Sequence, residues 1–413
     1  MSTAVLFNLP GASGHINPTV GLVSGLINRG ERVIYYAGED SRRQFEALGA
    51  TFRTYAPFFE YQHSAAMATA LLDGAFMMLG QAENALAGLI RVMEQDKPDY
   101  ILYDSCCLFG KYVAQRLGVP GICLVTTIVS TPLLLTSDLP LAWQVVKELT
   151  FGVPRVFEAV RRIKDLLASV GLKYRGLPYH MFDVFANEGD LNIVFLSPSA
   201  QPFHRFLKKN YLLVGPSIPE GRDPPADLPI GLGSSLPVIY VSLGTVHNLK
   251  QDFYRQCFKA FAELPCHVVM SVGKDTDIAA LGSIPVNFTV RNRVPQLEVL
   301  KRTRVFVSHG GMNSINESLY FGVPLVMVPQ QVEQGFNARR VEKLGAGRLL
   351  KSEKITVDSL RETVSQVLQD ERYRQNAAQL GQQMQGLGGY ARAVDEILRF
   401  VHGDTQPALR KTA

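Results

Sequence analysis

Several common patterns are scarce in this sequence of 413 residues. The five cysteines are odd in number and form no C-x-x-C pair, which favours free thiols in a reducing cytoplasm over a disulfide framework. No block of five like charges occurs and the formal net charge is only +5, so we expect no nucleic-acid partner. No H-E-x-x-H or other compact ligand set is present, so we predict no metal site and no cofactor.

Long hydrophobic runs are also missing. The longest segment without a formal charge, residues 117–137, contains two glycines and two prolines. A spanning helix there would leave polar groups unsatisfied in lipid, so we interpret it as a short buried strand followed by a loop. No signal peptide is evident at the start of the chain. We therefore expect a cytoplasmic protein without a transmembrane segment, present as a monomer or weak homodimer.

The sequence does contain a repeated pattern of apolar segment, Gly-rich turn and helix. Such alternation predicts a parallel sheet with helices on both faces. The first helix is expected to carry Pro18 in its first turn, and the signal is weak between residues 130 and 190. In the first half, strands are predicted at residues 4–9, 32–37, 51–55, 100–103, 121–125, 191–196 and 211–214, and helices at 18–28, 42–48, 80–95 and 108–117.

Residues 216–237 are rich in proline and glycine, which is the composition of a linker. We predict an α/β chain of two doubly wound, Rossmann-like domains, residues 1–215 and 238–413, that face a central cleft. Ligands should bind at the carboxyl ends of the strands, and the last helix could pack back on the N-terminal domain. In the second half, strands are predicted at 238–242, 267–271, 286–290, 305–308 and 325–328, and helices at 252–262, 313–320, 335–344 and within 359–401.

The most informative segment is residues 305–317, where an apolar strand ends in His309 and two glycines precede a helix. Such a helix N-terminus presents N–H groups and positive dipole to an anion, and His309 and Ser314 can add donors for phosphate oxygens. No Lys follows the glycines, so this is not a P-loop. Glu317 could accept hydrogen bonds from ribose hydroxyls. The alternative is an ordinary strand–turn–helix with Ser314 as a simple N-cap.

The run His-Gly-Gly-Met-Asn-Ser at 309–314, with Glu317, resembles the donor signature of UDP-sugar-dependent glycosyltransferases of the GT-B fold. The greatest similarity is to the bacterial macrolide glycosyltransferase group. The resemblance implies an inverting, metal-independent enzyme that moves a hexose, with glucose expected, from a UDP-sugar to a hydroxyl of a small hydrophobic natural product. Four further motifs support it in the same order, at residues 14–18, 238–245, 293–296 and 329–337.

The resemblance also implies roles for individual residues. His309 would contact the diphosphate, Glu317 the ribose, and Glu333 and Gln334 the sugar hydroxyls. Arg293 stands where the family usually has Trp, so the uracil would stack on a guanidinium. Glu333 is one methylene longer than the usual Asp. The other implied donor-binding residues are Ser242, Gly244, Thr245, Val294, Gln296, Gly311, Met312, Asn313 and Ser314.

His15 is the candidate catalytic base, in the loop that follows the first predicted strand. Transfer to a hydroxyl needs a base, and histidine, with an ordinary pKa of ~6.5, suits this role. Asp104, at the end of a neighbouring predicted strand, could hold the imidazole in one tautomer and stabilise its positive charge. The resemblance supports this dyad. The alternative is that His15 and Asp104 simply cap the helices that follow them.

The acceptor side is expected to be apolar, because residues 57–80 and 128–157 are rich in the Met and aromatic side chains that line adaptable pockets. Plain core or loop packing explains these segments equally well. The candidate pocket residues are Phe58, Phe76, Met77, Ile128 and Trp143. Three other functions stay open: transfer to membrane lipids, for which residues 155–164 are a weak basic amphipathic signal, a UDP-sugar epimerase of the same fold, and a non-catalytic auxiliary protein.

Overall fold

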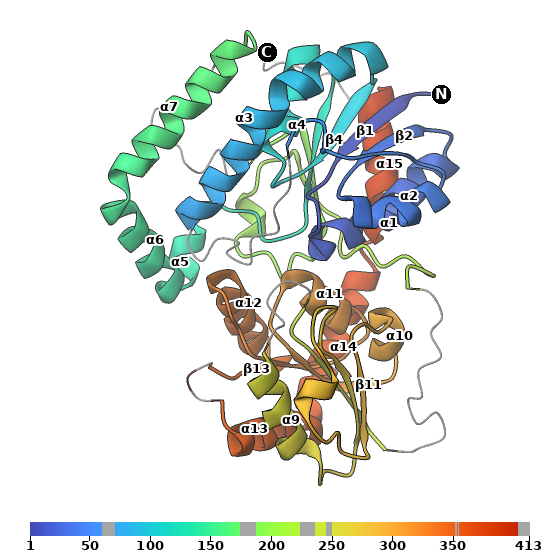
Figure 1. The fold of residues 1–413 in the computed structure, drawn as a ribbon, viewed down its shortest axis with the longest axis vertical. Coiled ribbons are helices and arrows are strands. Elements are labelled where there is room, and N and C mark those ends of the chain that lie inside the picture. Colours follow the sequence, from blue (N-terminus) through green and yellow to red (C-terminus); the bar gives the residue numbers. More distant parts are fainter. Residues whose placement is uncertain are drawn as a thin grey trace. The chain divides into compact units, whose positions relative to one another are not determined.

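The computed structural model describes residues 1–59, 71–173, 187–223, 236–244, 250–351, 353 and 355–403. The chain divides into two compact units, Met1–Ser217 with Leu387–Ala413 (unit 1) and Ile218–Gly386 (unit 2) (Figure 1). The middle of the predicted linker, residues 224–235, lies outside the described residues, as does Thr245. None of the described helices is long and apolar enough to cross a membrane.

Unit 1 is built on a parallel sheet of seven strands in the order β3-β2-β1-β4-β5-β6-β7. The strands are short and mostly buried, as expected for a parallel sheet that is covered on both faces. Since all strands run the same way, their carboxyl ends meet at one edge. The strands are β1 (Thr3–Phe7), β2 (Arg32–Tyr36), β3 (Thr51–Arg53), β4 (Tyr100–Asp104), β5 (Gly121–Val125), β6 (Leu191–Val194) and β7 (Tyr211–Leu213).

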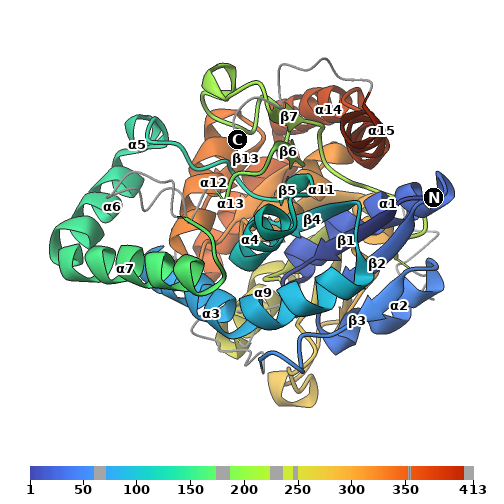
Figure 2. The ribbon, with the colours of Figure 1, turned by 90° about the horizontal axis from the view of Figure 1, so that it is seen from above.

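The helices of unit 1 differ from the prediction in three places. The helix predicted at 80–95, α3, begins at Leu71. The first helix begins at Ser13, so the prediction that Pro18 stands in its first turn is wrong; the fixed φ of proline fits a helix, and the cost is one missing backbone bond. Three helices, α5 to α7, occupy the region of weak signal, and α7 packs beside α3 (Figure 2). The helices are α1 (Ser13–Asn28), α2 (Arg42–Ala47), α3 (Leu71–Asp96), α4 (Leu108–Leu117), α5 (Leu134–Ser137), α6 (Leu139–Phe151), α7 (Val153–Ser169) and α15 (Gly389–His402).

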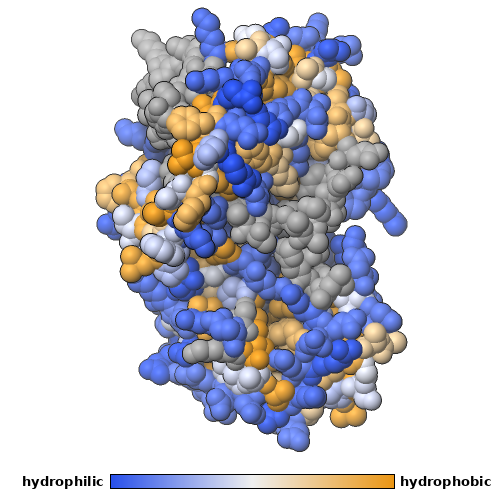
Figure 3. Space-filling model, turned by 60° about the vertical axis from the view of Figure 1, so that its left-hand side comes forward, coloured by the Kyte–Doolittle hydropathy of each residue, from blue (hydrophilic) through white to orange (hydrophobic). Residues whose placement is uncertain are grey.

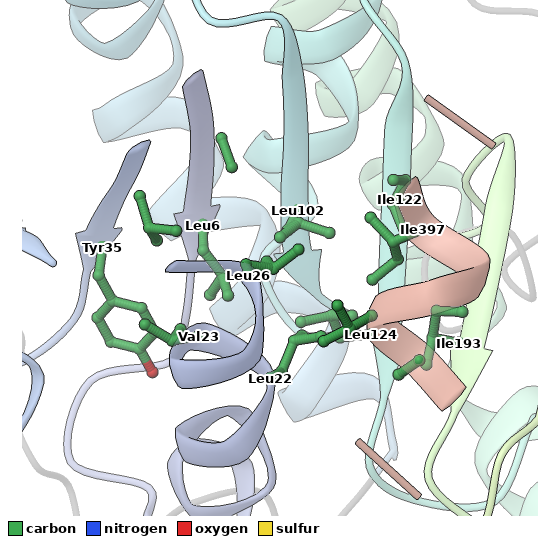
Figure 4. Packing of buried hydrophobic residues seen from close by; sticks show 14 of the residues in the cluster. Leu6, Leu22, Val23, Leu26, Tyr35, Leu102, Ile122, Leu124, Ile193 and Ile397 are labelled. Atoms are coloured by element: carbon green, nitrogen blue, oxygen red, sulfur yellow. The ribbon is translucent and has the colours of Figure 1, made fainter. Parts of the chain in front are cut away.

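The last helix of the chain, α15, completes the core of unit 1. It packs on α1 and β6, and its Ile397 lies among Leu22, Leu124 and Ile193 (Figure 4). Two glycines of α1 allow the close approach. A Cβ at Gly21 would lie 2.6 Å from the Tyr390 ring, and one at Gly25 would lie 2.7 Å from Val394. Larger residues at these two positions would force α15 away from the core.

Unit 2 has a six-stranded parallel sheet in the order β10-β9-β8-β11-β12-β13, with a separate apolar cluster on each face. The strands are β8 (Val238–Ser242), β9 (His267–Ser271), β10 (Phe288–Arg291), β11 (Thr303–Ser308), β12 (Leu325–Met327) and β13 (Gly347–Leu349). The helices are α9 (Gln251–Phe261), α10 (Gln296–Leu300), α11 (Met312–Tyr320), α12 (Val332–Lys343), α13 (Val357–Gln369) and α14 (Glu371–Gln385).

The predicted alternation of strands and helices is found in both units, and the boundaries shift by a few residues. The strand expected at 286–290 lies at Phe288–Arg291, and Val286, which was expected to begin it, is fully exposed. The helical segment 359–401 is three helices, interrupted at Asp370 and at Gly386–Gly388, where glycines end α14 and begin α15. The short strand β13 was not predicted.

Candidate functional site

In unit 1, the carboxyl ends of three adjacent strands bring polar side chains together. Asp104 is the last residue of β4, Thr126 follows β5, and His15 lies in the first turn of α1, after β1. His15 Nδ1 lies 2.9 Å from Asp104 Oδ2 and 3.1 Å from Thr126 Oγ1. The Asp104 side chain is fully buried, whereas that of His15 is 18% exposed. The arrangement thus offers one partly exposed imidazole held by a buried carboxylate.

The partners of His15 specify its tautomer. A carboxylate only accepts hydrogen bonds, so Nδ1 donates its proton to Asp104, and the basic lone pair of the neutral ring is on Nε2. Asp104 is itself fixed, since its Oδ1 accepts a bond from the Cys106 backbone N–H (2.8 Å). The buried Asn8 side chain donates to the His15 carbonyl (3.1 Å) and anchors the start of α1.

The capping alternative for these two residues is wrong. The N-cap of α1 is Ala12 and that of α4 is Cys107, and neither helix start receives a side-chain cap bond. His15 lies within α1 rather than in a preceding loop, because the helix begins at Ser13, before Pro18. The two side chains contact each other across the sheet edge instead.

In unit 2, the loop between β11 and α11 carries His309 and two glycines. The φ of Gly310 is +83°, a left-handed conformation that favours glycine. Gly311, and not Ser314, is the N-cap of α11, so the N-cap prediction for Ser314 is wrong and Ser314 lies in the first turn. The first N–H groups of α11, beginning near Met312, therefore point toward the same loop as His309, which is the geometry of an anion site.

Two glycines lie directly against the His309 ring. A Cβ at Gly244 would lie 2.7 Å from its Cε1, and a Cβ at Gly311 would lie 2.4 Å from its Nε2. Gly244 follows the end of β8, where the Ser242 hydroxyl accepts a bond from the Gly244 N–H (3.3 Å). The two neighbouring strand ends, β8 and β11, thus define the position of the imidazole.

Glu317 lies at the centre of a buried network on α11. Its Oε1 accepts bonds from Arg222 Nη1 (2.5 Å) and Asn313 Nδ2 (2.7 Å), and its Oε2 accepts one from Gln296 Nε2 (2.7 Å). The Glu317 side chain is completely buried and that of Arg222 is nearly so. Asp223 pairs with Arg222 (3.0 Å) and accepts a bond from the Leu297 N–H (2.9 Å), which joins α10 to the network.

Arg222 stays charged in this environment. Burial alone lowers the pKa of its guanidinium, but the Glu317 and Asp223 carboxylates outweigh burial and the pKa is raised. Sequence reasoning missed Arg222, because a single arginine at the edge of a Pro-rich segment carries no local signal. It also missed Thr126 as a partner of His15; its place directly after a predicted strand was the only available clue.

The sugar-segment residues Glu333 and Gln334 lie in the first turn of α12. Gln334 is buried, and its Oε1 accepts a bond from the Gln330 N–H (2.8 Å). Asn337 Nδ2 donates to the Gly310 carbonyl (3.2 Å), so α12 is attached to the loop that carries His309. Arg293 is exposed before α10, and the adjacent Val294 is half-buried against the apolar cluster of this face of the sheet.

The predicted acceptor-pocket residues lie in different settings within unit 1. Phe58 packs against α3 at Gly88, while Phe76 lies beneath the guanidinium groups of Arg155 and Arg162 of α7. Met77, on α3, and Ile128, after β5, are half-buried. Trp143 is 72% exposed on α6. An acceptor pocket built from these five residues stays a prediction.

One group of described residues could hold a metal ion. A ring nitrogen of His15, a carboxylate oxygen of Asp104 and the sulfur of Cys106 all lie within 4.8 Å of one another. Sequence spacing did not predict this group, because His15 and Cys106 are brought together only by the sheet.

Comparison with known proteins shows which proteins this chain is similar to. Residues 255–388 match the family model of the C-terminal domain of erythromycin biosynthesis protein CIII-like proteins. The chain is 35% identical over 401 residues to the NDP-glycosyltransferase YjiC of Bacillus licheniformis, covering 96% of this chain and 97% of that one. It is 34% identical over 412 residues to YojK of Bacillus subtilis, described as an uncharacterized UDP-glucosyltransferase, covering 99% and 100%.

The fold agrees with these relatives. The crystal structure of the kitacinnamycin glycosyltransferase superposes with a TM-score of 0.80 at 28% identity, covering 96% of this chain and 98% of that chain. Two Rossmann-like parallel-sheet units are the architecture of the GT-B fold, as the sequence predicted. The chain therefore belongs to the macrolide and natural-product glycosyltransferase family of the GT-B fold and is an enzyme that uses a nucleoside diphosphate sugar.

Proposed function

We propose that this enzyme transfers a hexose, with glucose as the expected sugar, from a UDP-sugar to a hydroxyl of a small hydrophobic natural product. The observation that carries the proposal is the pairing of His15 with the buried Asp104 at 2.9 Å. The names of relatives support the substrates: two refer to UDP-glucose or NDP-sugar transfer, and others to erythromycin and kitacinnamycin.

The proposed reaction is a single displacement. His15 Nε2 takes the proton of the acceptor hydroxyl while its oxygen bonds to the anomeric carbon, from the face opposite UDP. The bond from that carbon to the UDP oxygen breaks, UDP leaves with the electron pair, and the configuration inverts. Asp104 keeps the ring in the reactive tautomer and stabilises the imidazolium, which then loses its proton to water.

The donor would bind in unit 2. The N-terminus of α11 and His309 would stabilise the diphosphate charge without a metal ion. A carboxylate has about four lone-pair sites, and Arg222, Asn313 and Gln296 use three of those on Glu317. Because the Glu317 side chain is fully buried, contact with a ribose hydroxyl would require one of these donors to move aside. Glu333 and Gln334 would bind the sugar hydroxyls and Arg293 the base. The remaining members of this proposed set are Ser242, Gly244, Thr245, Val294, Gly311, Met312 and Ser314.

A donor panel tests the proposal. With a promiscuous phenolic acceptor, UDP-glucose should give a conjugate of the expected mass together with one UDP per conjugate, and EDTA should leave the rate unchanged. The readouts are product mass and released UDP. Donor consumption without a conjugate would indicate an epimerase or a hydrolase, whereas absence of UDP binding would indicate an auxiliary protein. Restoration of an EDTA-abolished rate by Mg²⁺ would contradict the metal-independent mechanism.

A second experiment tests the diphosphate site. In Gly311→Ala the new methyl group would overlap the His309 ring, where a Cβ lies 2.4 Å from Nε2. A hydrogen bond to a charged group contributes about 1.5–3 kcal/mol, so we expect a roughly 10- to 100-fold weaker UDP affinity by calorimetry. Gly386→Ala is the matched control in unit 2, since its Cβ would make only ordinary contacts. If both variants bind UDP with equal affinity, the proposed contact between His309 and the diphosphate is wrong.

One observation favours membrane lipids as a second acceptor class. Apolar side chains are exposed on α6 and at the start of α7, a side of unit 1 that Figure 3 turns forward. Such a row could rest in a lipid interface. A sterol and a diacylglycerol, presented in vesicles in the same assay, separate this candidate from the first. The exposed residues are Leu139, Trp143, Val146, Phe151, Val153 and Phe157.

A further inference from the structure

Unit 1 holds three different kinds of possible metal ligand beside the candidate base His15. Imidazole nitrogen, carboxylate oxygen and thiol sulfur, from His15, Asp104 and Cys106, lie within 4.8 Å of one another. The turn after β4 holds Cys106 close to Asp104, since the Cys106 N–H bonds Asp104 Oδ1. His15 and Cys106 are both partly exposed, so an ion can reach them from solvent.

This donor set has a clear metal preference. Zn²⁺ and similar borderline-soft ions bind His, Asp and Cys together at about 2.0–2.3 Å, and three protein ligands leave one open position. Mg²⁺ and Ca²⁺ prefer oxygen ligands and gain little from a thiolate. The Asp104 carboxylate and the Cys106 thiolate would together neutralise a divalent ion. The three ligand atoms, within 4.8 Å of one another, would move closer together around one ion.

We propose that His15, Asp104 and Cys106 form a binding site for Zn²⁺ and ions like it, and that an ion bound there blocks transfer. Binding releases the Cys106 thiol proton to solvent, so affinity should rise with pH. A metal on His15 Nε2 uses the basic lone pair directly, and a metal on Nδ1 moves the ring proton to Nε2. In both cases Nε2 loses the lone pair that would take the acceptor proton.

The binding part is tested without any substrate, using Co²⁺ as a spectroscopic probe on the full chain after chelator treatment. The wild type should bind one Co²⁺ with a thiolate-to-cobalt charge-transfer band in the near ultraviolet. Cys106→Ser should lose that band, and His15→Ala should weaken binding by at least about tenfold, since even changes around the ligands of a metal cost 10- to 100-fold. Cys266→Ser, at a buried cysteine of unit 2, should keep the band.

The inhibitory part rests on the proposed function and has its own readout. Zn²⁺ should reduce transfer by the wild type and much less by Cys106→Ser, with each rate normalised to the same variant without metal, and a chelator should restore the wild-type rate. If the charge-transfer band persists in Cys106→Ser, or is absent from the wild type, the proposed metal site is wrong. Equal Zn²⁺ inhibition of both proteins overturns the blocking role. Co²⁺ binding together with full transfer by His15→Ala would contradict the proposed function alone.

Discussion

Replacing His15 with alanine should lower kcat for transfer by about 10²–10⁴-fold and leave UDP affinity unchanged. The ring that would take the acceptor proton is lost, while the proposed donor site, built on β8, β11 and α11, keeps all of its residues. The measurements are steady-state kinetics with UDP-glucose and a phenolic acceptor, and UDP binding by calorimetry. This separation of catalysis from binding distinguishes a base from a residue that merely supports the fold.

Variants of two residues that contact His15 test its role further. Asp104→Asn should also lower kcat strongly, because an amide N–H toward Nδ1 favours the wrong tautomer. Thr126→Val removes the hydroxyl at 3.1 Å from Nδ1 but leaves the carboxylate in place, so its effect should be much smaller. A His15→Ala protein that keeps its kcat, or that loses UDP binding in parallel, would exclude His15 as the base.

Replacing Arg222 with methionine should destabilise unit 2 by about 3–5 kcal/mol, the cost of leaving a buried charge without its partner. Glu317 would keep Asn313 and Gln296 as donors, but no cation would balance its fully buried carboxylate. Urea denaturation followed by circular dichroism gives the free energy of unfolding, and hydrogen exchange in α11 assigns the loss to unit 2. We also expect weaker UDP binding, since the carboxylate would lose its orientation.

The control is Lys301→Met, which breaks an exposed ion pair with Glu298 in the same unit. Pairs of this kind contribute about 0–1 kcal/mol, so this variant should unfold almost as the wild type does. The double variant Arg222→Met with Glu317→Gln removes the buried charge as well as its partner. It should therefore be more stable than Arg222→Met alone, and equal or lower stability would show that the charge pair is not the cause.

The two sheets could be predicted from the sequence because their signal is local. Apolar runs such as residues 4–9 and 305–308 alternate with glycine turns and helices, and a buried parallel sheet demands this pattern. The candidate dyad could be proposed because His15 and Asp104 both follow strand ends. The start of α1 was missed, because the general preference for proline in a first turn does not forbid a helix that begins one turn earlier.

The contacts that complete the candidate sites of unit 1 and of unit 2 could not be predicted from the sequence, because they join residues far apart in the chain. Arg222 meets Glu317 across 95 positions of sequence, and no pattern around either residue indicates the other. Thr126 and Cys106 reach His15 only because β1, β4 and β5 are neighbours in the sheet. Strand order follows from the packing of whole elements, so residues whose roles depend on it are found only in the folded structure.

The place of α15 in the core of unit 1 sets an order of events during synthesis. Residues 218–386 form one continuous unit, which is complete once they have left the ribosome. Unit 1 begins first but must wait for α15, since Ile397 and Val394 fill its apolar cluster. Until then, the side of α1 that carries Gly21 and Gly25 lacks the Tyr390 and Val394 side chains that pack on it. The half that carries the candidate base is therefore completed after residues 218–386, and it is the half that loss of α15 would damage.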